Sequence, residues 1–183
     1  MWIWAHRFSC LKLAGLALLI VYFLTNPFYV EPTWIAAYLA VVVGVGAAFV
    51  LAIDPVIDRF FPKSKVNLDP IGGQIISEAR RRPLRVALLL PGEDGFFFVP
   101  LLWVGITPIT AAIATAAFAA LHYPQFPLRT CAVKFIFLFC IAIVVLPHGL
   151  GSVVVGHLLL DAMAIFIGGK LFVNTPAAGP RDA

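Results

Sequence analysis

Long apolar stretches, separated by short breaks rich in proline or polar residues, cover most of the chain. Residues 34–53 are twenty positions without a charged side chain. At about 1.5 Å per residue, a helix of this length matches the roughly 30 Å hydrocarbon core of a bilayer. Trp34 opens the stretch with an aromatic ring of the kind that favours membrane interfaces. The pattern therefore predicts a helix that crosses a membrane.

Several other stretches have the same apolar character. Residues 86–122 are too long for one crossing, because a helix of about 37 residues would reach roughly 55 Å. A Gly-Ile-Thr-Pro break at 105–108 divides them into two helices, and Pro147 and Gly149 make a similar break further on. We predict an all-α, polytopic helix bundle with six spans: 13–24, 34–53, 84–104, 107–122, 131–146 and 152–173. The first span is long enough if 8–11 join it and Lys12 snorkels to the interface.

Polar residues concentrate in one internal region and at the C-terminus. Residues 54–85 hold seven of the thirteen Lys and Arg residues, together with prolines and a Gly-Gly pair. This composition predicts a basic cytoplasmic loop, with a short surface helix over 75–81. Residues 174–183 form a predicted polar tail. The whole chain, 1–183, is expected to be a single membrane domain.

The basic residues fix a predicted orientation, because cytoplasmic loops of membrane proteins are enriched in Lys and Arg. With the N-terminus in the cytoplasm, all thirteen basic residues fall on the cytoplasmic side of a six-span path. The predicted outer connections, 27–32, 105–108 and 147–151, contain none. We therefore expect an integral protein of a bacterial inner (plasma) membrane with both termini in the cytoplasm. The run Arg80–Arg82 is expected to contact anionic lipid headgroups.

Composition excludes several functional classes. Hydrophobic residues make up 62% of the chain and charged residues 12%, against about half and about a quarter in soluble domains. A soluble enzyme or a DNA-binding domain is therefore excluded. The net charge of +4 follows from the basic cytoplasmic loops, so we predict the lipid bilayer, and no nucleic acid, as a partner. The three cysteines have no C-x-x-C spacing, which argues against a disulfide framework or a zinc knuckle.

A few ionisable residues lie inside the predicted spans, where each normally faces a cavity or a partner because a charge at a helix centre costs about 2.5–3.5 kcal/mol. Glu93 and Asp161 both lie about 13 Å inside the cytoplasmic ends of their helices. His157 and Asp161 are four positions apart and share one helical face. Glu93 and Asp94 point about 100° apart, so at most one of them aims squarely at a shared pocket. The candidate site residues are Glu93, Asp94, His122, His157 and Asp161.

Three short segments carry a resemblance to a known family. Residues 93–98 (EDGFFF) stand where the CPBP family of intramembrane proteases, which includes the CAAX prenyl endopeptidases and bacteriocin-processing proteins, has E-E-x-x-x-R. Residues 118–122 (FAALH) resemble its F-x-x-x-H motif, and residues 157–161 (HLLLD) its H-x-x-x-N/D motif. The segments occur in the family's order, each on a predicted span. The resemblance covers 82–172, the expected protease-like core.

The resemblance implies that the chain hydrolyses a peptide bond of a peptide or membrane protein, in or near the membrane and without a metal. It implies that Glu93 and His122 activate a water molecule. It further implies that His157 and Asp161 stabilise the oxyanion, with Asp94 in support. A neutral imidazole can donate a hydrogen bond to developing negative charge. An ionised Asp161 accepts only, so it must be protonated or merely orient His157.

Two departures from the family pattern motivate alternatives. Phe98 stands at the arginine position and Asp94 at the second glutamate position, which breaks an acid–arginine pair on one helix face. Asp94 must then be protonated, meet a cation from another segment, or face a water cavity connected to the cytoplasm. One alternative function is a catalytically silent protein of the same fold that binds or scaffolds a membrane partner. Another is a proton or cation pathway through the same groups.

A metal-dependent version of the hydrolase is a further hypothesis. Two histidines and two carboxylates can bind Zn²⁺ with a water molecule completing the site. The candidate residues lack a short ligand spacing such as H-E-x-x-H. The sequence therefore favours a site without a cofactor.

Overall fold

The computed structural model describes residues 2–53, 83–122 and 128–173, with side chains described for 10–49, 51–52, 91–121 and 131–163. Over these residues the regular secondary structure is entirely helical, which confirms the predicted all-α class. The predicted surface helix at 75–81, most of the predicted loop at 54–85 and the predicted tail at 174–183 lie outside the described residues. The α-helices are α1 (Trp2–Thr25), α2 (Pro32–Ala48), α5 (Pro83–Val104), α6 (Pro108–His122), α7 (Leu128–Val144) and α8 (Leu150–Val173).

Proline and glycine mark the ends of several helices. α2 begins at Pro32 and α6 at Pro108, the position where a missing N–H costs nothing. Gly105, which follows α5, has φ of 99°, a backbone conformation that a side chain would strain. A π-helical turn, Phe49–Ile53, continues α2, and a short 3₁₀ turn, Leu146–His148, links α7 to α8. The helix ends lie within a few residues of the predicted spans, except that α1 starts at Trp2.

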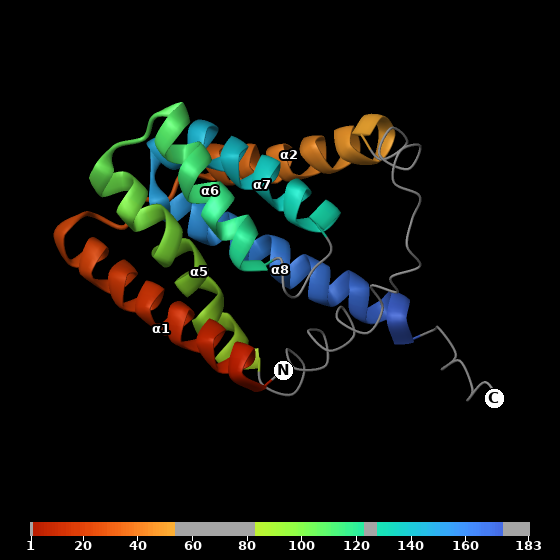
Figure 1. The fold of residues 1–183 in the computed structure, drawn as a ribbon, viewed down its shortest axis with the longest axis horizontal. Helices are drawn as coiled ribbons and strands as arrows, with labels where there is room; N and C mark the ends of the chain where they lie inside the picture. Colours follow the sequence, from red (N-terminus) through yellow and green to blue (C-terminus); the bar gives the residue numbers. More distant parts are fainter. Residues whose placement is uncertain (1, 54–82, 123–127, 174–183) are drawn as a thin grey trace.

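The helices form two groups around a shared core (Figure 1). α1 and α5 lie side by side along most of their lengths, while α2 packs on α7 and α8. α6 contacts both α5 and α7 and so joins the groups. The core is apolar and includes Val99, Ile141 and Val153, which have no exposed surface. This packing places α5 and α8 in direct contact.

The described connections lie together at one end of the bundle (Figure 1). The backbone N–H of Glu31, between α1 and α2, donates a hydrogen bond to Ser152 Oγ on α8. The rings of Trp34 and His148 stack with centroids 3.4 Å apart. The Tyr29 hydroxyl donates to Glu31, and this hydrogen bond raises the pKa of Tyr29 above its ordinary value of 10.0. The first two contacts join the start of α2 to the start of α8 and to the turn that precedes it.

Apolar length supports a membrane location for part of the described chain. Residues Cys131–His148 form an 18-residue helical stretch with mean hydropathy 2.3, long and apolar enough to cross a membrane. Four shorter apolar stretches, of 10–17 residues, are Cys10–Thr25, Pro32–Ala48, Pro108–Leu121 and Leu150–Met163. Many large apolar side chains also lie on the outside of the bundle, among them Leu24, Val43, Val104 and Ile109, each at least 70% exposed.

Candidate functional site

The most deeply buried acid of the described residues is Asp94, whose partner comes from another helix. Asp94 on α5 is 4% exposed, and His157 Nδ1 on α8 lies 3.0 and 3.1 Å from its two carboxylate oxygens. When Asp94 is ionised its oxygens only accept, and the hydrogen of the contact is then on His157 Nδ1, which donates it. Because α5 and α8 pack together, residues 63 positions apart in sequence form this pair.

The other ring nitrogen of His157 faces a second carboxyl. His157 Nε2 lies 3.5 Å from Asp161 Oδ2, one helical turn further along α8. The imidazole therefore stands between Asp94 and Asp161. Either the ring is an imidazolium that donates from both nitrogens, or Asp161 carries the proton and donates to Nε2. One proton beyond the hydrogen on Nδ1, carried by either Nε2 or Asp161, satisfies both contacts.

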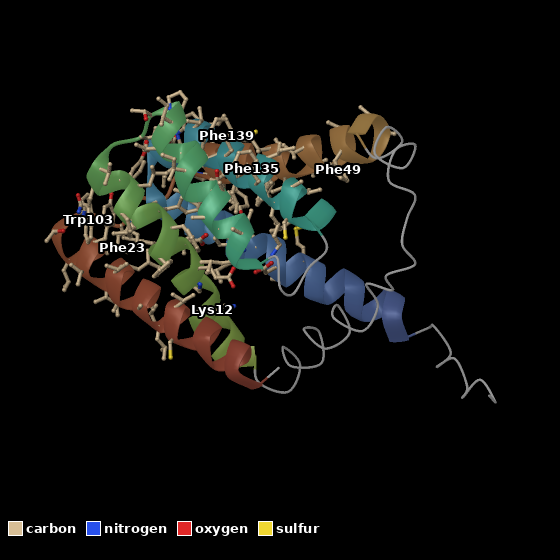
Figure 2. All side chains as sticks on the ribbon, in the orientation of Figure 1. Lys12, Phe23, Phe49, Trp103, Phe135 and Phe139 are labelled. Carbon is tan, nitrogen blue, oxygen red and sulfur yellow. The ribbon has the colours of Figure 1, made fainter. Side chains whose placement is uncertain are left out.

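Glu93 has a different partner from its neighbour Asp94. Its carboxylate forms an ion pair with Lys12 Nζ, and the two side chains are 17% and 23% exposed. Lys12 belongs to α1 and lies at the face of α1 toward α5 (Figure 2). Lys12, whose snorkelling would lengthen the first predicted span, is paired with Glu93 in the structure. Lys134 on α7 also interacts electrostatically with both Glu93 and Asp161.

Four helices thus contribute to what we call the acid–histidine cluster, defined as Glu93, Asp94, His157 and Asp161 with the lysines Lys12 and Lys134. The cluster holds three carboxyls and two lysines. Its net charge is zero when Asp94, His157 and Asp161 together carry one proton more than two carboxylates and a neutral imidazole would. Such balance lowers the cost of burying charges in an apolar bundle.

Two small cavities meet at Glu93. The inner cavity, with a volume of about 10 Å³, has room for about one water molecule. It is lined by Glu93, Asp94 and His157 together with Phe97, Phe98, Ala114, Thr115, Phe118 and Leu138. The outer cavity, also of about 10 Å³, is lined by Glu93, Lys12 and five apolar residues: Leu11, Phe96, Phe97, Phe118 and Leu121. Glu93, Phe97 and Phe118 line both. These three side chains therefore form the boundary between the two cavities.

The three motif segments named from the sequence come together at the inner cavity. Glu93 and Asp94 belong to the first segment, Phe118 to the second and His157 to the third, on α5, α6 and α8. The side chain of His122 lies outside the described side chains, and α6 ends at this residue. Asp161 contacts His157 but does not line the cavity.

Three residues in or beside the cluster escape sequence reasoning. Two are its lysines, Lys12 and Lys134. The third is Tyr38 of α2, which is 1% exposed and whose ring stacks over His157 with centroids 6.5 Å apart. Gly156 makes room for it, because a Cβ there would lie 2.7 Å from Tyr38 Cγ. Gly156, directly before His157 in the sequence, is the feature of the sequence that indicates a closely packed neighbour here. Phe98, at the arginine position of the family pattern, is 3% exposed and belongs to the apolar core.

The fold and the cluster define a class: an all-helical bundle with a buried carboxyl–imidazole–carboxyl chain beside a small cavity. Comparison with known proteins finds no matching family model, no matching curated protein and no matching solved structure. Among the described side chains, no group of three His, Cys, Asp or Glu residues is arranged to hold a metal ion.

Proposed function

We propose that the chain is a polytopic protein of a bacterial inner membrane that hydrolyses a peptide bond of a peptide or membrane-protein substrate. Apolar helices and exposed apolar side chains support the membrane location, because a water-soluble surface would not carry so many. The observation that carries the hydrolase proposal is the inner cavity. Segments from α5, α6 and α8 that are far apart in sequence place an acid pair and a histidine around one space.

In the proposed reaction, Glu93 takes a proton from a water molecule held in the inner cavity. The water oxygen forms a bond to the substrate carbonyl carbon, and the carbonyl oxygen becomes an oxyanion. In the imidazolium form of His157, Nε2–H donates a hydrogen bond to the oxyanion, while Nδ1–H donates to Asp94, which holds the ring. The C–N bond then breaks, and the proton on Glu93 passes to the leaving nitrogen. His122 is the proposed partner of Glu93, and Asp161 the orienting neighbour of His157.

The acids of the cluster already have partners within the protein, which supports a second candidate function. Glu93 is ion-paired with Lys12, and both ring nitrogens of His157 face carboxyls. A protein in which these contacts only hold the helices together would bind or scaffold a membrane partner without cleaving it. The same carboxyl–imidazole–carboxyl chain is also the arrangement that a proton or cation pathway requires. Proton flux into sealed vesicles that is unchanged in an Asp161→Asn, Glu93→Gln double variant would discard that pathway.

The hydrolase proposal predicts that Glu93→Gln abolishes cleavage. The purified chain is reconstituted into liposomes with solubilised bacterial inner-membrane proteins, and new α-amino groups are tagged and identified by mass spectrometry. We expect wild-type protein to generate a defined set of new N-termini, and Glu93→Gln to generate them about 10²–10⁴-fold more slowly, because a general base contributes that much.

Glu31→Gln is the matched control for this experiment, because the same chemical change falls in the loop between α1 and α2. We expect it to cleave like wild type. Equal cleavage by Glu93→Gln would exclude the proposed role. If wild-type protein produces no new N-termini while a membrane partner co-purifies with it and with Glu93→Gln alike, the silent candidate replaces the hydrolase.

The proposed topology predicts that both termini lie in the cytoplasm. In a bacterial host, alkaline phosphatase fused after Ala183 should be inactive, while a fluorescent protein at the same point should fluoresce. Phosphatase inserted at Thr107, in the connection between α5 and α6, should be active. Active phosphatase at the C-terminus would overturn the six-span path.

A further inference from the structure

α1 and α5 touch through their backbones at a point defined by three glycines. A Cβ placed on Gly15 would lie 1.8 Å from Gly92 O, and one on Gly92 would lie 2.0 Å from Lys12 O. A Cβ on Gly95 would lie 2.0 Å from Gly15 O. Only glycine permits such an approach. The contact fixes Lys12 of α1 directly against the turn of α5 that carries Glu93.

Beyond Arg85, near the start of α5, neither α5 nor α6 carries a Lys or Arg. Residues 86–128 contain no Lys or Arg, and Phe98 in the core adds none. Glu93 borders two cavities whose other walls are largely apolar, an environment in which a lone carboxylate is costly. Lys12 offsets that cost through a direct ion pair.

Several charged groups face Glu93 from the helices around it. α1 contributes Lys12, α5 contributes Asp94, α7 contributes Lys134, and α8 contributes His157 and Asp161. α6 carries His122, whose side chain lies outside those described. The two other carboxyls repel a charge on Glu93, so its ionised state depends on the lysines. Lys12 makes an ion pair with Glu93, and Lys134 interacts with it electrostatically.

We propose that Lys12 is a positioning residue that keeps Glu93 ionised and holds its carboxylate at the boundary between the inner and outer cavities. In this proposal, the glycine contact between α1 and α5 brings Lys12 to the site. This role of Lys12 rests on the proposed function, because an ionised Glu93 is the form that accepts a proton from water. The test of this role needs no substrate, so its failure can be distinguished from a failure of the hydrolase proposal.

Dicyclohexylcarbodiimide, an apolar reagent that enters membranes, distinguishes the two forms of a carboxyl. A protonated carboxyl adds across a C=N bond: its proton goes to one nitrogen, its oxygen bonds to the central carbon, and rearrangement gives a stable N-acylurea. An ionised carboxylate lacks the proton for this step. The chain in liposomes is treated at pH 7.5, and tandem mass spectrometry measures the adduct on Glu93 separately from Asp94.

Wild-type Glu93 is expected to label slowly, and Lys12→Met to raise its labelling about tenfold, because loss of an adjacent opposite charge increases the protonated fraction of a carboxyl by roughly that factor or more. Lys12→Arg keeps the charge and should label like wild type. In wild type, labelling should rise as pH falls; in Lys12→Met this rise should begin at higher pH.

Unchanged Glu93 labelling and pH profile in Lys12→Met, in protein that unfolds at the wild-type temperature, would overturn the inference. If Lys12→Met does not fold, Lys12→Gln replaces it, because a polar side chain can still hydrogen-bond to Glu93 without supplying charge. Equal labelling of Lys12→Arg and Lys12→Met would likewise overturn it. Labelling as expected, with no cleavage in the N-terminus assay, would remove the hydrolase and leave the ion pair's role standing.

Discussion

Replacing Gly92 with leucine is expected to lower the free energy of unfolding by about 3 kcal/mol or more. Any Cβ at this position meets the backbone of Lys12 at 2.0 Å, and a backbone cannot rotate away as a side chain can. α1 must therefore move off α5, which also separates Lys12 from Glu93. Thermal unfolding in detergent, followed by tryptophan fluorescence, measures the loss, and Glu93 labelling by the carbodiimide should rise with it.

Gly44→Leu is the matched control. Gly44 lies in α2, where an added Cβ would meet nothing within 4 Å. Leucine in a helix interior is about 0.5–1 kcal/mol more favourable than glycine, so this variant should be as stable as wild type or slightly more so. Similar losses in both variants would show that the destabilisation comes from added bulk rather than from the close approach of α1 to α5.

The helices could be predicted from the sequence because their signals are local. The third predicted span, 84–104, differs by one residue from α5, Pro83–Val104. Its end is marked by Gly105, whose positive φ no other residue type adopts easily, and by Pro108, which starts the next helix. The beginning of α1 was harder to predict, because Arg7 and Lys12 interrupt its apolar pattern.

The candidate site could be predicted only where its geometry is local. The spacing of His157 and Asp161 predicts a shared helical face, and the two side chains lie 3.5 Å apart. Which of Glu93 and Asp94 faces His157 depends on how α5 is rotated against α8, and no residue pattern within α5 fixes that rotation. The structure pairs Asp94 with His157 and turns Glu93 toward α1. The predicted alternatives for Asp94 included a cationic partner from another segment; in the structure its partner is an imidazole.

The role of Lys12 was hidden for a related reason. A lysine near the end of an apolar stretch ordinarily extends to the membrane interface, and the sequence alone favours that interpretation. The competing signal is spread over two distant segments: Gly15 on one, and Gly92 and Gly95 on the other. Small residues at such positions allow helices to approach closely in membranes. Only the pairing of the two segments shows that the lysine is held against an acid.

Replacing His157 with leucine is expected to lower the free energy of unfolding by about 3–5 kcal/mol, the usual cost of removing one partner from a buried charged pair. Asp94 is 4% exposed and lies 3.0 Å from His157 Nδ1, so the substitution leaves a carboxylate without the donor that its oxygens contact. Leucine also lacks the planar ring that stacks with Tyr38. Thermal and denaturant unfolding of the variant in detergent measure the loss.

A double-mutant cycle separates the unpaired carboxylate from the change in packing. Asp94→Leu with His157→Leu removes both polar groups, and apolar replacement of a buried pair is often neutral or stabilising. We therefore expect the double variant to be more stable than His157→Leu alone, with an interaction energy of about 2–3 kcal/mol. His148→Leu, at an exposed histidine stacked on Trp34, should cost under about 1 kcal/mol. Additive losses in the cycle would mean that Asp94 and His157 are not energetically coupled, and the contact between them could not hold the imidazole for catalysis.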